Sequence, residues 1–278
     1  MSAKRIPLAG VIGDPIAHSL SPRLHGHWLS SMGLPGHYIP MHVVAEDLEQ
    51  VLRTLQKVGF AGVNITIPHK EAVLEIADKI TDRAALMGAA NTLIFGKDGS
   101  IYADNTDGYG FTQNVRQGAP NWNPSAGPAA VFGAGGASRA VVASLLELGV
   151  PILRLSNRSR PRADALRQEF GTRIEVFDWI HAGNMLDGAE TVVNTTSLGM
   201  TGKPEFRVPL DGFKPGAVVT DLVYTPLRTH FLQAAEAAGC ITVDGLGMLL
   251  HQAVPGFERW FGVRPEVTED LRTAVMGT

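Results

Sequence analysis

Short apolar runs alternate with amphipathic segments through most of the 278 residues, and this alternation restricts the fold more than any other feature of the chain. Residues 48–58 illustrate the amphipathic pattern, because their apolar side chains recur at the spacing of one helix face. Strand–helix–strand repetition with apolar strands is typical of a largely parallel sheet that is covered on both faces. The sequence therefore predicts an α/β fold.

The expected strands form two series, separated by a stretch without periodicity. That stretch, residues 117–128 (QGAPNWNPSAGP), contains three prolines and indicates a surface loop that leads into a new unit. Six strands are expected after it, the number in a complete nucleotide-binding doubly wound sheet. The expected strands are 8–12, 38–44, 62–67, 91–95 and 101–103 in the first series, and 129–132, 152–156, 174–177, 191–194, 218–221 and 241–243 in the second.

After Gly245 the pattern becomes helical again, and this last segment is expected either to cap the second sheet or to cross back to the first. We divide the chain into a first domain of residues 1–107, to which 247–278 return, and a second domain of residues 108–246. One continuous domain with a long loop is the alternative. Besides 48–58, helices are expected at 139–148, 163–169 and 230–238.

Composition excludes several classes of protein. Apolar residues make up 45% of the chain and charged residues 18%, a balance typical of a folded protein and not of a disordered one. The net charge of −3 provides no global positive field for nucleic acid or an anionic membrane. A single cysteine, Cys240, excludes an internal disulfide and a multi-cysteine metal cluster.

From these numbers we expect a cytoplasmic protein with small-molecule partners, no metal site and no contact with nucleic acid or membrane. No apolar stretch approaches the ~20 residues that a membrane span requires. We expect a homodimer as the assembly, although no residue pattern points to it.

Residues 129–140 (AAVFGAGGASRA) read as an apolar strand, a glycine turn and the start of a helix. Glycines in such a turn let backbone N–H groups approach a pyrophosphate, and the helix adds its positive N-terminal end. A strict dinucleotide motif would place a third glycine where this chain has Ser138. The motif predicts a dinucleotide site, and a purely structural glycine turn is the alternative.

The turn after the next expected strand indicates which dinucleotide would bind. An NAD site usually has Asp or Glu there, to bind the ribose 2′-hydroxyl. Residues 157–162 read NRSRPR, with three arginines and no carboxylate. Because guanidinium groups bind phosphate oxygens bidentately, this turn favours NADP over NAD. A solvated basic loop without a ligand is the alternative.

Polar residues in the first half fall at expected strand and helix ends, where α/β sheets gather their ligand sites. Ser19 and Ser21 would present both hydroxyls to one ligand if their segment is extended, although Ser21 could instead cap a helix that starts at Pro22. Lys70 is expected at the start of a helix whose apolar face is Val73, Ile76, Ala77 and Ile80. A lysine there is disfavoured by the helix dipole, which hints at a function.

Asp107 supplies a carboxylate at a strand-to-helix junction, where an N-cap is the competing interpretation, and Asn91 opens an expected strand. Singly, each polar residue has a structural interpretation at least as good as a functional one. Their common position at element ends is the informative observation.

The chain resembles the shikimate dehydrogenase family. The segments HSLSP, NITIPHK, GAANTL, DNTDG, GAGGASRA, NRS, NTTSLGM and DGLGMLLHQA stand in the order and spacing of that family, from Gly13 to about Ala253. The resemblance implies an N-terminal α/β substrate domain, a C-terminal NADP-binding Rossmann domain and a last helix that returns to the first domain. It also implies the NADPH-dependent, reversible reduction of 3-dehydroshikimate to shikimate, on the route to chorismate and the aromatic amino acids.

The resemblance also implies roles for individual residues. Lys70 and Asp107 would form the catalytic pair at the reacting oxygen. Ser159 stands where the family often has threonine, and Asp14 where it often has asparagine, both small departures. The implied substrate ligands are Ser19, Ser21, Thr66, Asn91, Tyr224 and Gln252; the implied cofactor contacts are Asp82, Gly133, Ala134, Gly135, Gly136, Ala137, Asn157, Arg158, Ser159, Arg162, Leu222 and Gly245.

Two other functions compete with this one. A quinate/shikimate dehydrogenase of the same fold would use NAD, and the arginines of residues 157–162 speak against it. A non-catalytic NADP-binding protein would have no need of both Lys70 and Asp107.

Overall fold

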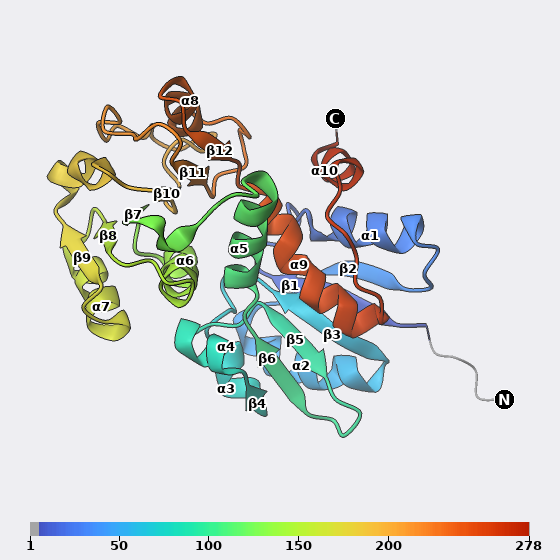
Figure 1. The fold of residues 1–278 in the computed structure, drawn as a ribbon. Helices are drawn as coiled ribbons and strands as arrows, with labels where there is room; N and C mark the ends of the chain where they lie inside the picture. Colours follow the sequence, from blue (N-terminus) through green and yellow to red (C-terminus); the bar gives the residue numbers. More distant parts are fainter. Residues whose placement is uncertain (1–5, 278) are drawn as a thin grey trace. The chain divides into compact units, whose positions relative to one another are not determined.

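The computed structural model describes residues 6–277, which divide into two compact units (Figure 1). The N-terminal unit combines the chain up to Thr106 with the residues from Leu250 onward, and the C-terminal unit is Asp107–Leu249. Two indoles attach the returning segment within the N-terminal unit. Trp260 Nε1 donates to the carbonyl of Leu93 (3.1 Å), and Trp28 Nε1 donates to the carbonyl of Glu266 (2.9 Å).

The N-terminal unit contains a mixed six-stranded sheet in the order β2-β1-β3-β5-β6-β4. β1 is parallel to β2 and β3, whereas β5 is antiparallel to both β3 and β6. The start of β5 and the end of β6 therefore lie at the same edge as the carboxyl end of β3. The strands are β1 (Leu8–Gly13), β2 (His37–His42), β3 (Phe60–Ile65), β4 (Lys79–Ile80), β5 (Thr92–Phe95) and β6 (Ile101–Asp104).

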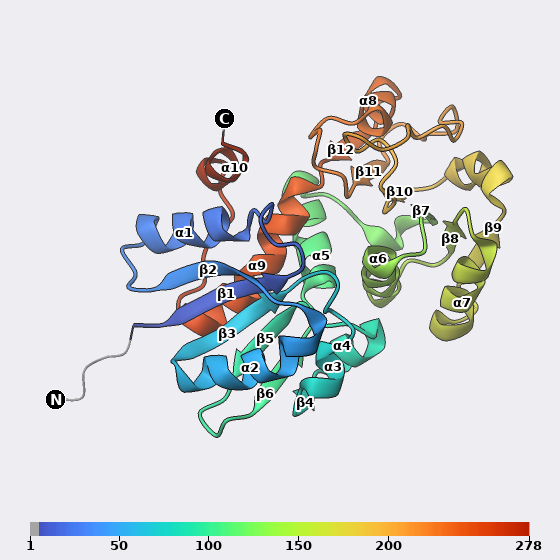
Figure 2. The ribbon, with the colours of Figure 1, turned by 180° about the vertical axis from the view of Figure 1, so that it is seen from behind.

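Helices cover both faces of this sheet. Figures 1 and 2 show α1 and α2 on opposite faces. α9 begins in the C-terminal unit and ends in the N-terminal one. The helices are α1 (Ser21–Ser31), α2 (Leu48–Lys57), α3 (Val73–Ile76), α4 (Asp82–Met87), α9 (Leu246–Phe261) and α10 (Glu269–Met276), with a short 3₁₀ turn η1 at Ala45–Asp47.

The prediction of a helix that starts near Lys70 is wrong. Lys70 lies in a turn, only Val73–Ile76 is helical, and Lys79–Ile80 forms β4. The backbone becomes extended at Ala77 (φ −69°, ψ 136°). Asp78 then accepts from the Ile101 N–H (2.7 Å), which attaches the chain to the sheet edge. An aspartate that bonds a neighbouring strand competes with helical hydrogen bonding, which explains why the apolar spacing alone misled.

The two interpretations of Ser19 and Ser21 also need correction. Leu20 has helical dihedrals (φ −81°, ψ −11°), so the segment is not extended. α1 begins at Ser21 itself, so Ser21 does not cap it from outside. Ser19 Oγ accepts the Ser21 N–H at 3.3 Å, which makes Ser19 the residue that satisfies an early helical donor.

The C-terminal unit contains a fully parallel sheet in the order β12-β11-β10-β7-β8-β9. On β7, Ala129 and Val131 pack into one core while Ala130 and Phe132 pack into the other, the alternation expected of a strand covered on both faces. The strands are β7 (Ala129–Phe132), β8 (Leu153–Ser156), β9 (Ile174–Phe177), β10 (Thr191–Asn194), β11 (Val218–Asp221) and β12 (Ile241–Val243).

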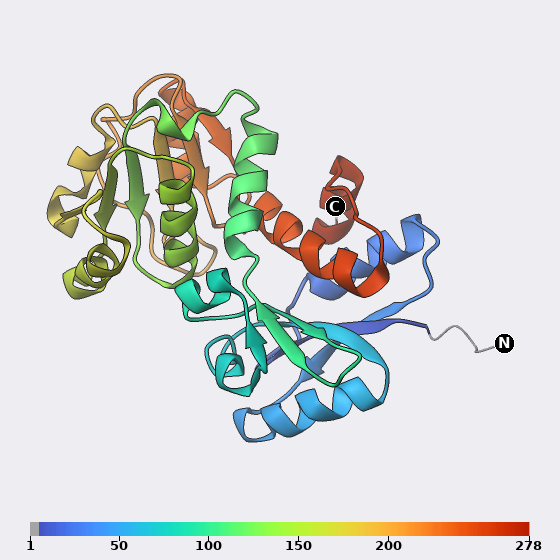
Figure 3. The same ribbon diagram turned by 60° about the horizontal axis from the view of Figure 1, so that its bottom comes forward.

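Helices α5, α6 and α7 contribute to one core of this unit, and α8 contributes to the other together with the 3₁₀ segment η3. Figure 3 views the sheet with α6 in front of it. This arrangement confirms the predicted α/β fold class with a Rossmann-like second sheet. The helices are α5 (Asp107–Gly118), α6 (Gly136–Glu147), α7 (Arg160–Phe170) and α8 (His230–Ala237), with 3₁₀ segments η2 (Pro124–Ala126) and η3 (Trp179–Leu186).

An aromatic cluster in the N-terminal unit surrounds a buried histidine. The His25 ring is fully buried and stacks on Tyr38, with ring centroids 3.9 Å apart. Trp28 and Phe257 also lie against it. Burial lowers the pKa of His25 from 6.5 to about 3.

This histidine predicts acid sensitivity of the N-terminal unit. The unfolded chain binds a proton on His25 below about pH 6.5 and the folded chain does not, so stability present above that pH is lost as the pH falls toward 3. By pH 5 the loss amounts to about 2 kcal/mol. Urea unfolding of the wild type and of His25→Phe at pH 7.5 and pH 5 measures it, and the variant should show the smaller drop. Equal drops in both proteins would contradict the prediction.

Candidate active site

Polar residues of the N-terminal unit meet where β3 and β6 end and β5 begins. The Ile65 N–H donates to the carbonyl of Asn91 (2.9 Å), and the Ala90 N–H donates to the carbonyl of Lys70 (2.8 Å). Thr66 follows β3 directly, and Thr106 follows β6 after one residue. The antiparallel course of β5 thus brings Thr66, Lys70 and Asn91 to one sheet edge.

A buried histidine fixes the turn that carries Lys70. His69 is 1% exposed, and its Nε2 lies 2.7 Å from the carbonyl of Val43. Since a carbonyl only accepts, Nε2 carries the proton. The His69 N–H also donates to the Thr66 carbonyl (3.0 Å). Lys70, itself half-buried, therefore stands in a turn attached to neighbouring backbone on both sides, and His69 is a residue whose role the sequence did not reveal.

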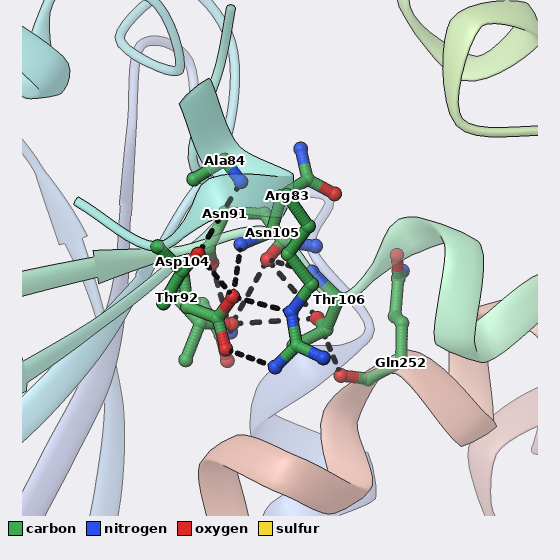
Figure 4. Close-up of polar contacts among 10 residues, drawn as sticks. Arg83, Ala84, Asn91, Thr92, Asp104, Asn105, Thr106 and Gln252 are labelled. Atoms are coloured by element: carbon green, nitrogen blue, oxygen red, sulfur yellow. Dashed lines mark hydrogen bonds and ion pairs between the residues drawn. The ribbon is translucent and has the colours of Figure 1, made fainter. Parts of the chain in front are cut away.

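Asn91 has a defined amide orientation (Figure 4). Its Oδ1 accepts from the backbone N–H of Thr106 (3.0 Å) and from the hydroxyl of Thr92 (2.9 Å). A backbone N–H only donates, so Oδ1 faces Thr106 and the amide nitrogen faces the other way. The Thr106 hydroxyl lies 2.8 Å from the carbonyl of Gln252, which attaches α9 to the same cluster.

An ion pair between Arg83 and Asp104 supports this cluster. Asp104 accepts from Nε of Arg83 (2.6 Å) and from the hydroxyl of Thr81 (2.8 Å), as Figure 4 shows for the Arg83 contacts. Burial alone would raise the pKa of Asp104, but Arg83 and Thr81 outweigh it and hold the pKa below its usual value. Asp104 also accepts the N–H of Asn105 (2.8 Å), so a charged group fixes the backbone that leads to Thr106 and Asp107.

A second chain of hydrogen bonds connects Tyr38 with Asn91. The Tyr38 hydroxyl donates to Asn64 Oδ1 (2.6 Å), and Asn64 Nδ2 donates to the carbonyl of Asn91 (3.0 Å). Burial raises the pKa of Tyr38 strongly. Tyr38 was not singled out from the sequence, because a tyrosine on an edge strand gives no signal of its own.

The glycine turn of the C-terminal unit has one structural glycine and two that packing does not require. Gly133 has φ +110°, and a Cβ there would stand 2.4 Å from the Thr195 hydroxyl. At Gly135 and Gly136 a Cβ would meet open space. Ser138, which replaces the third glycine of the motif, is buried, and its hydroxyl donates to the Gly133 carbonyl (2.5 Å). The structural alternative therefore explains Gly133 and Ser138, and leaves two exposed glycines for a ligand.

The start of α6 fits an anion. Its N-cap is Gly135, which has no side chain to satisfy the first helical N–H groups. Asn157 holds the turn against the end of β8, because its Oδ1 accepts the Ala134 N–H (3.2 Å) and its Nδ2 donates to the Ser159 carbonyl (2.9 Å). Ala137 is exposed beside this turn.

The three arginines after β8 are not equivalent. Arg160 forms ion pairs with Asp178 and Asp164. Arg158 and Arg162 are exposed, as is Ser159 between them. The turn contains no carboxylate of its own, so Arg158 and Arg162 can bind a phosphate without competition from a neighbour within residues 157–162.

A cavity of about 290 Å³ lies at the ends of β10 and β11, between two loops. Leu222 and Tyr224 line it from one loop and Thr195 from the other. Burial raises the pKa of Tyr224. Gly245 stands against this region so closely that a Cβ would lie 2.4 Å from the Leu222 carbonyl oxygen, which explains why this position is glycine.

The remaining predicted residues have simple positions. Asp82 is exposed in the first turn of α4, where a carboxylate favours the helix dipole, and Thr81 is the N-cap. Asp107 is the buried first residue of α5 and directly follows Thr106. Within residues 6–277 no grouping of His, Cys, Asp and Glu side chains suits a metal ion, and no helix has the length and apolar character of a membrane span.

Comparisons with known proteins agree with this geometry. A family model described as the shikimate dehydrogenase substrate binding domain matches residues 11–93, and one described as the shikimate 5′-dehydrogenase C-terminal domain matches residues 245–276. The NADP(+) shikimate dehydrogenase of Cereibacter sphaeroides is 71% identical over 99% of this chain and 98% of its own.

Solved structures resemble the whole chain as well. The shikimate 5-dehydrogenase of Thermus thermophilus, in complex with NADP(H) and shikimate, has a TM-score of 0.85 and 36% identity, covering 98% of this chain and 99% of its own. The quinate dehydrogenase of Corynebacterium glutamicum, in complex with NAD, has a TM-score of 0.89 and 31% identity over the same shares. With 71% identity to a named relative over nearly its full length, the chain belongs to the shikimate dehydrogenase family.

Proposed function

We propose that this protein is an NADP-dependent shikimate dehydrogenase, which interconverts 3-dehydroshikimate and shikimate in the biosynthesis of chorismate and the aromatic amino acids. The observation that carries the proposal is the 71% identity, over 99% of the chain, to a relative of that name. The resemblance of the motifs and the positions of their side chains support it.

The C-terminal unit fits NADP along one sheet edge. β11, β10, β7 and β8 are neighbours in the sheet, in that order. The cavity lies after β10 and β11, the glycine turn after β7 and the arginine turn after β8. A dinucleotide laid across this edge would place its pyrophosphate at residues 133–137. Its 2′-phosphate would then meet Arg158 and Arg162, and its nicotinamide would enter the cavity at Leu222. Asn157 supports the turn, and Ser159 and Gly245 complete this set of proposed contacts.

The N-terminal unit provides groups for a polyhydroxylated carboxylic acid. Ser19 and Ser21 supply hydroxyls for the carboxylate. Thr66, Asn91 and Gln252 supply donors and acceptors for the ring hydroxyls. Tyr224 is proposed as a further substrate ligand on the family resemblance. The amide oxygen of Asn91 already accepts from Thr106 and Thr92, which fixes the side chain within this cluster.

Bound NADP supplies the hydride chemistry, and the chain supplies the proton chemistry. Lys70 Nζ would hold or release the proton at the oxygen that changes between ketone and alcohol, with Asp107 as its partner. The turn fixed by His69 presents the lysine, and the backbone fixed by Asp104 presents the aspartate.

Asp82 is the least supported of the proposed cofactor contacts, since its place in the first turn of α4 accounts for it. We also place the enzyme in the cytoplasm with small-molecule partners only, in line with one cysteine and a net charge of −3. A homodimer is the assembly that light scattering should test.

Quinate oxidation with NAD is the second candidate, favoured by the likeness to the quinate dehydrogenase of Corynebacterium glutamicum. The absence of Asp and Glu from residues 157–162 speaks against NAD as the preferred cofactor.

An absorbance assay at about 340 nm, with shikimate or quinate and with NADP⁺ or NAD⁺, tests the function directly. We expect the highest kcat/KM for shikimate with NADP⁺, because the arginines would bind the 2′-phosphate, which NAD⁺ lacks. Equal efficiencies with NAD⁺ and NADP⁺ would contradict the cofactor assignment. Faster oxidation of quinate than of shikimate would favour the second candidate.

Replacing Lys70 tests the proton chemistry. Lys70→Ala should lower kcat by roughly 100-fold or more, the range for loss of a general acid or base, with KM for shikimate much less affected. Lys79→Ala is the matched control, since Lys79 lies on β4 and bonds the Tyr102 hydroxyl (2.8 Å). A Lys70→Ala enzyme with the kcat of the control would end the assignment.

Replacing arginines one at a time tests the phosphate site. Arg158→Ala should raise KM for NADPH by roughly 10-fold or more, the effect of losing a charged hydrogen bond, and leave KM for 3-dehydroshikimate nearly unchanged. Arg160→Ala should raise KM for NADPH less, because Asp178 and Asp164 already occupy that guanidinium. The two variants behaving alike would show that the turn does not bind the 2′-phosphate in the way proposed.

A further inference from the structure

Asp221, the last residue of β11, is a fully buried carboxylate to which the proposed chemistry gives no part. Its Oδ1 accepts from Asn194 Nδ2 (2.9 Å) and from the Val223 N–H (3.0 Å). Its Oδ2 accepts from the Thr229 hydroxyl (2.7 Å). One side chain thus joins the end of β10, the loop after β11 and the start of α8.

Two of these bonds lead into loops that line the 290 Å³ cavity. We call residues 195–200, after β10, the first loop and residues 222–225, after β11, the second loop. Asn194 passes the attachment to the first loop, since its Oδ1 accepts the N–H (3.0 Å) and the hydroxyl (2.7 Å) of Thr196. Thr196 Oγ1 in turn accepts the Leu198 N–H at 3.1 Å. In the second loop, the Val223 N–H bonds Asp221 directly.

Both loops have further contacts that make their positions matter. Thr195 of the first loop donates its hydroxyl to the Phe132 carbonyl (2.7 Å), beside the glycine turn. Leu222 of the second loop lies against Gly245, with no room for a Cβ between them. Because both loops line the cavity, their positions set its width.

Retaining a carboxylate in a fully buried position has an energetic cost. Burial raises the pKa of Asp221 from 3.8 to about 6, although the bonds from Thr229, Val223 and Asn194 all favour the charged form. An apolar residue would avoid the desolvation, but it could not accept three hydrogen bonds at the sheet edge. A role in positioning the two loops therefore explains this carboxylate better than a contribution to the free energy of folding.

We propose that Asp221 is a positioning residue: its carboxylate holds the first and second loops in the arrangement that receives the nicotinamide end of NADP. The identity of that ligand rests on the proposed function. Asp221 has no contact with the reacting atoms in this proposal, and it acts through the backbone of the two loops.

Amide hydrogen exchange of the cofactor-free protein, followed by mass spectrometry, tests the structural half. In Asp221→Ala, peptides that cover the two loops should exchange roughly 10-fold faster or more, while β7 and α6 keep their protection. Asp221→Asn should show a smaller effect, because its single amide oxygen can still accept from Val223 but its NH₂ edge cannot accept from Thr229. Thr220→Val is the matched control, since Thr220 is the preceding buried residue and its hydroxyl has no hydrogen-bond partner within residues 6–277.

Calorimetry and kinetics test the functional half on the same proteins. The number of NADP⁺ sites and the preference for NADP⁺ over NAD⁺ should stay near wild type, because Arg158 and Arg162 are unchanged. The kcat per NADP⁺ site should fall roughly 10-fold or more in Asp221→Ala and less in Asp221→Asn, as expected when a reacting group is misplaced. Thr220→Val should match the wild type.

Wild-type exchange in both loops of Asp221→Ala would overturn the proposal, as would an unchanged kcat per site in that variant. If Asp221→Ala loses NADP⁺ sites by unfolding, the Asp221→Asn variant decides the question. An Asp221→Asn protein with the full number of NADP⁺ sites and the wild-type kcat would overturn the proposal. The full number of sites with a lower kcat would support it. A wild-type protein that does not oxidise shikimate would instead refute the proposed function. The hydrogen-exchange result would still test whether Asp221 holds the two loops, because it needs neither substrate nor cofactor.

Discussion

Burial of the strands on both faces is the constraint from which the rest of this structure follows. β7 shows it most simply, since all four of its residues are buried and alternate between two cores. Strands of this kind have no exposed face for polar chemistry, so polar side chains collect where the strands end. In the N-terminal unit the antiparallel β5 extends this rule, because its start joins the ends of β3 and β6 and brings Asn91 beside Thr66.

Support for each proposed functional group comes from buried polar residues that are themselves fully engaged. Lys70 depends on His69, the backbone before Asp107 depends on Asp104, and the loops at the cavity depend on Asp221. The three supports differ in chemistry: an imidazole that donates to a carbonyl, a carboxylate paired with arginine, and a carboxylate held by neutral donors. In each, the buried group fixes backbone, and the backbone fixes the functional group.

Much of the fold could be predicted from the sequence, for a definable reason. Apolar runs bounded by turn residues identified β7, β9, β10, β11 and β12 at their observed bounds. The signal is strongest for β7, β10 and β11, whose residues are all buried. The expected helix at Lys70 failed because Asp78 bonds Ile101, a contact distant in sequence that no local spacing contains. The motifs predicted candidate site residues, but they could not show that Arg160 is already paired, or that Tyr38 and Asp221 bond their neighbours. Such roles depend on tertiary contacts, which a local sequence pattern does not contain.

The orientation of Asn91 has one more consequence. Its carbonyl oxygen is committed to a peptide N–H, so the side chain cannot rotate by half a turn without leaving that N–H unsatisfied. An asparagine without such a commitment can meet a hydroxyl in either sense, as giver or taker of the hydrogen. At Asn91 the peptide N–H of Thr106 removes this ambiguity, because turning the amide over would place its NH₂ group against another donor.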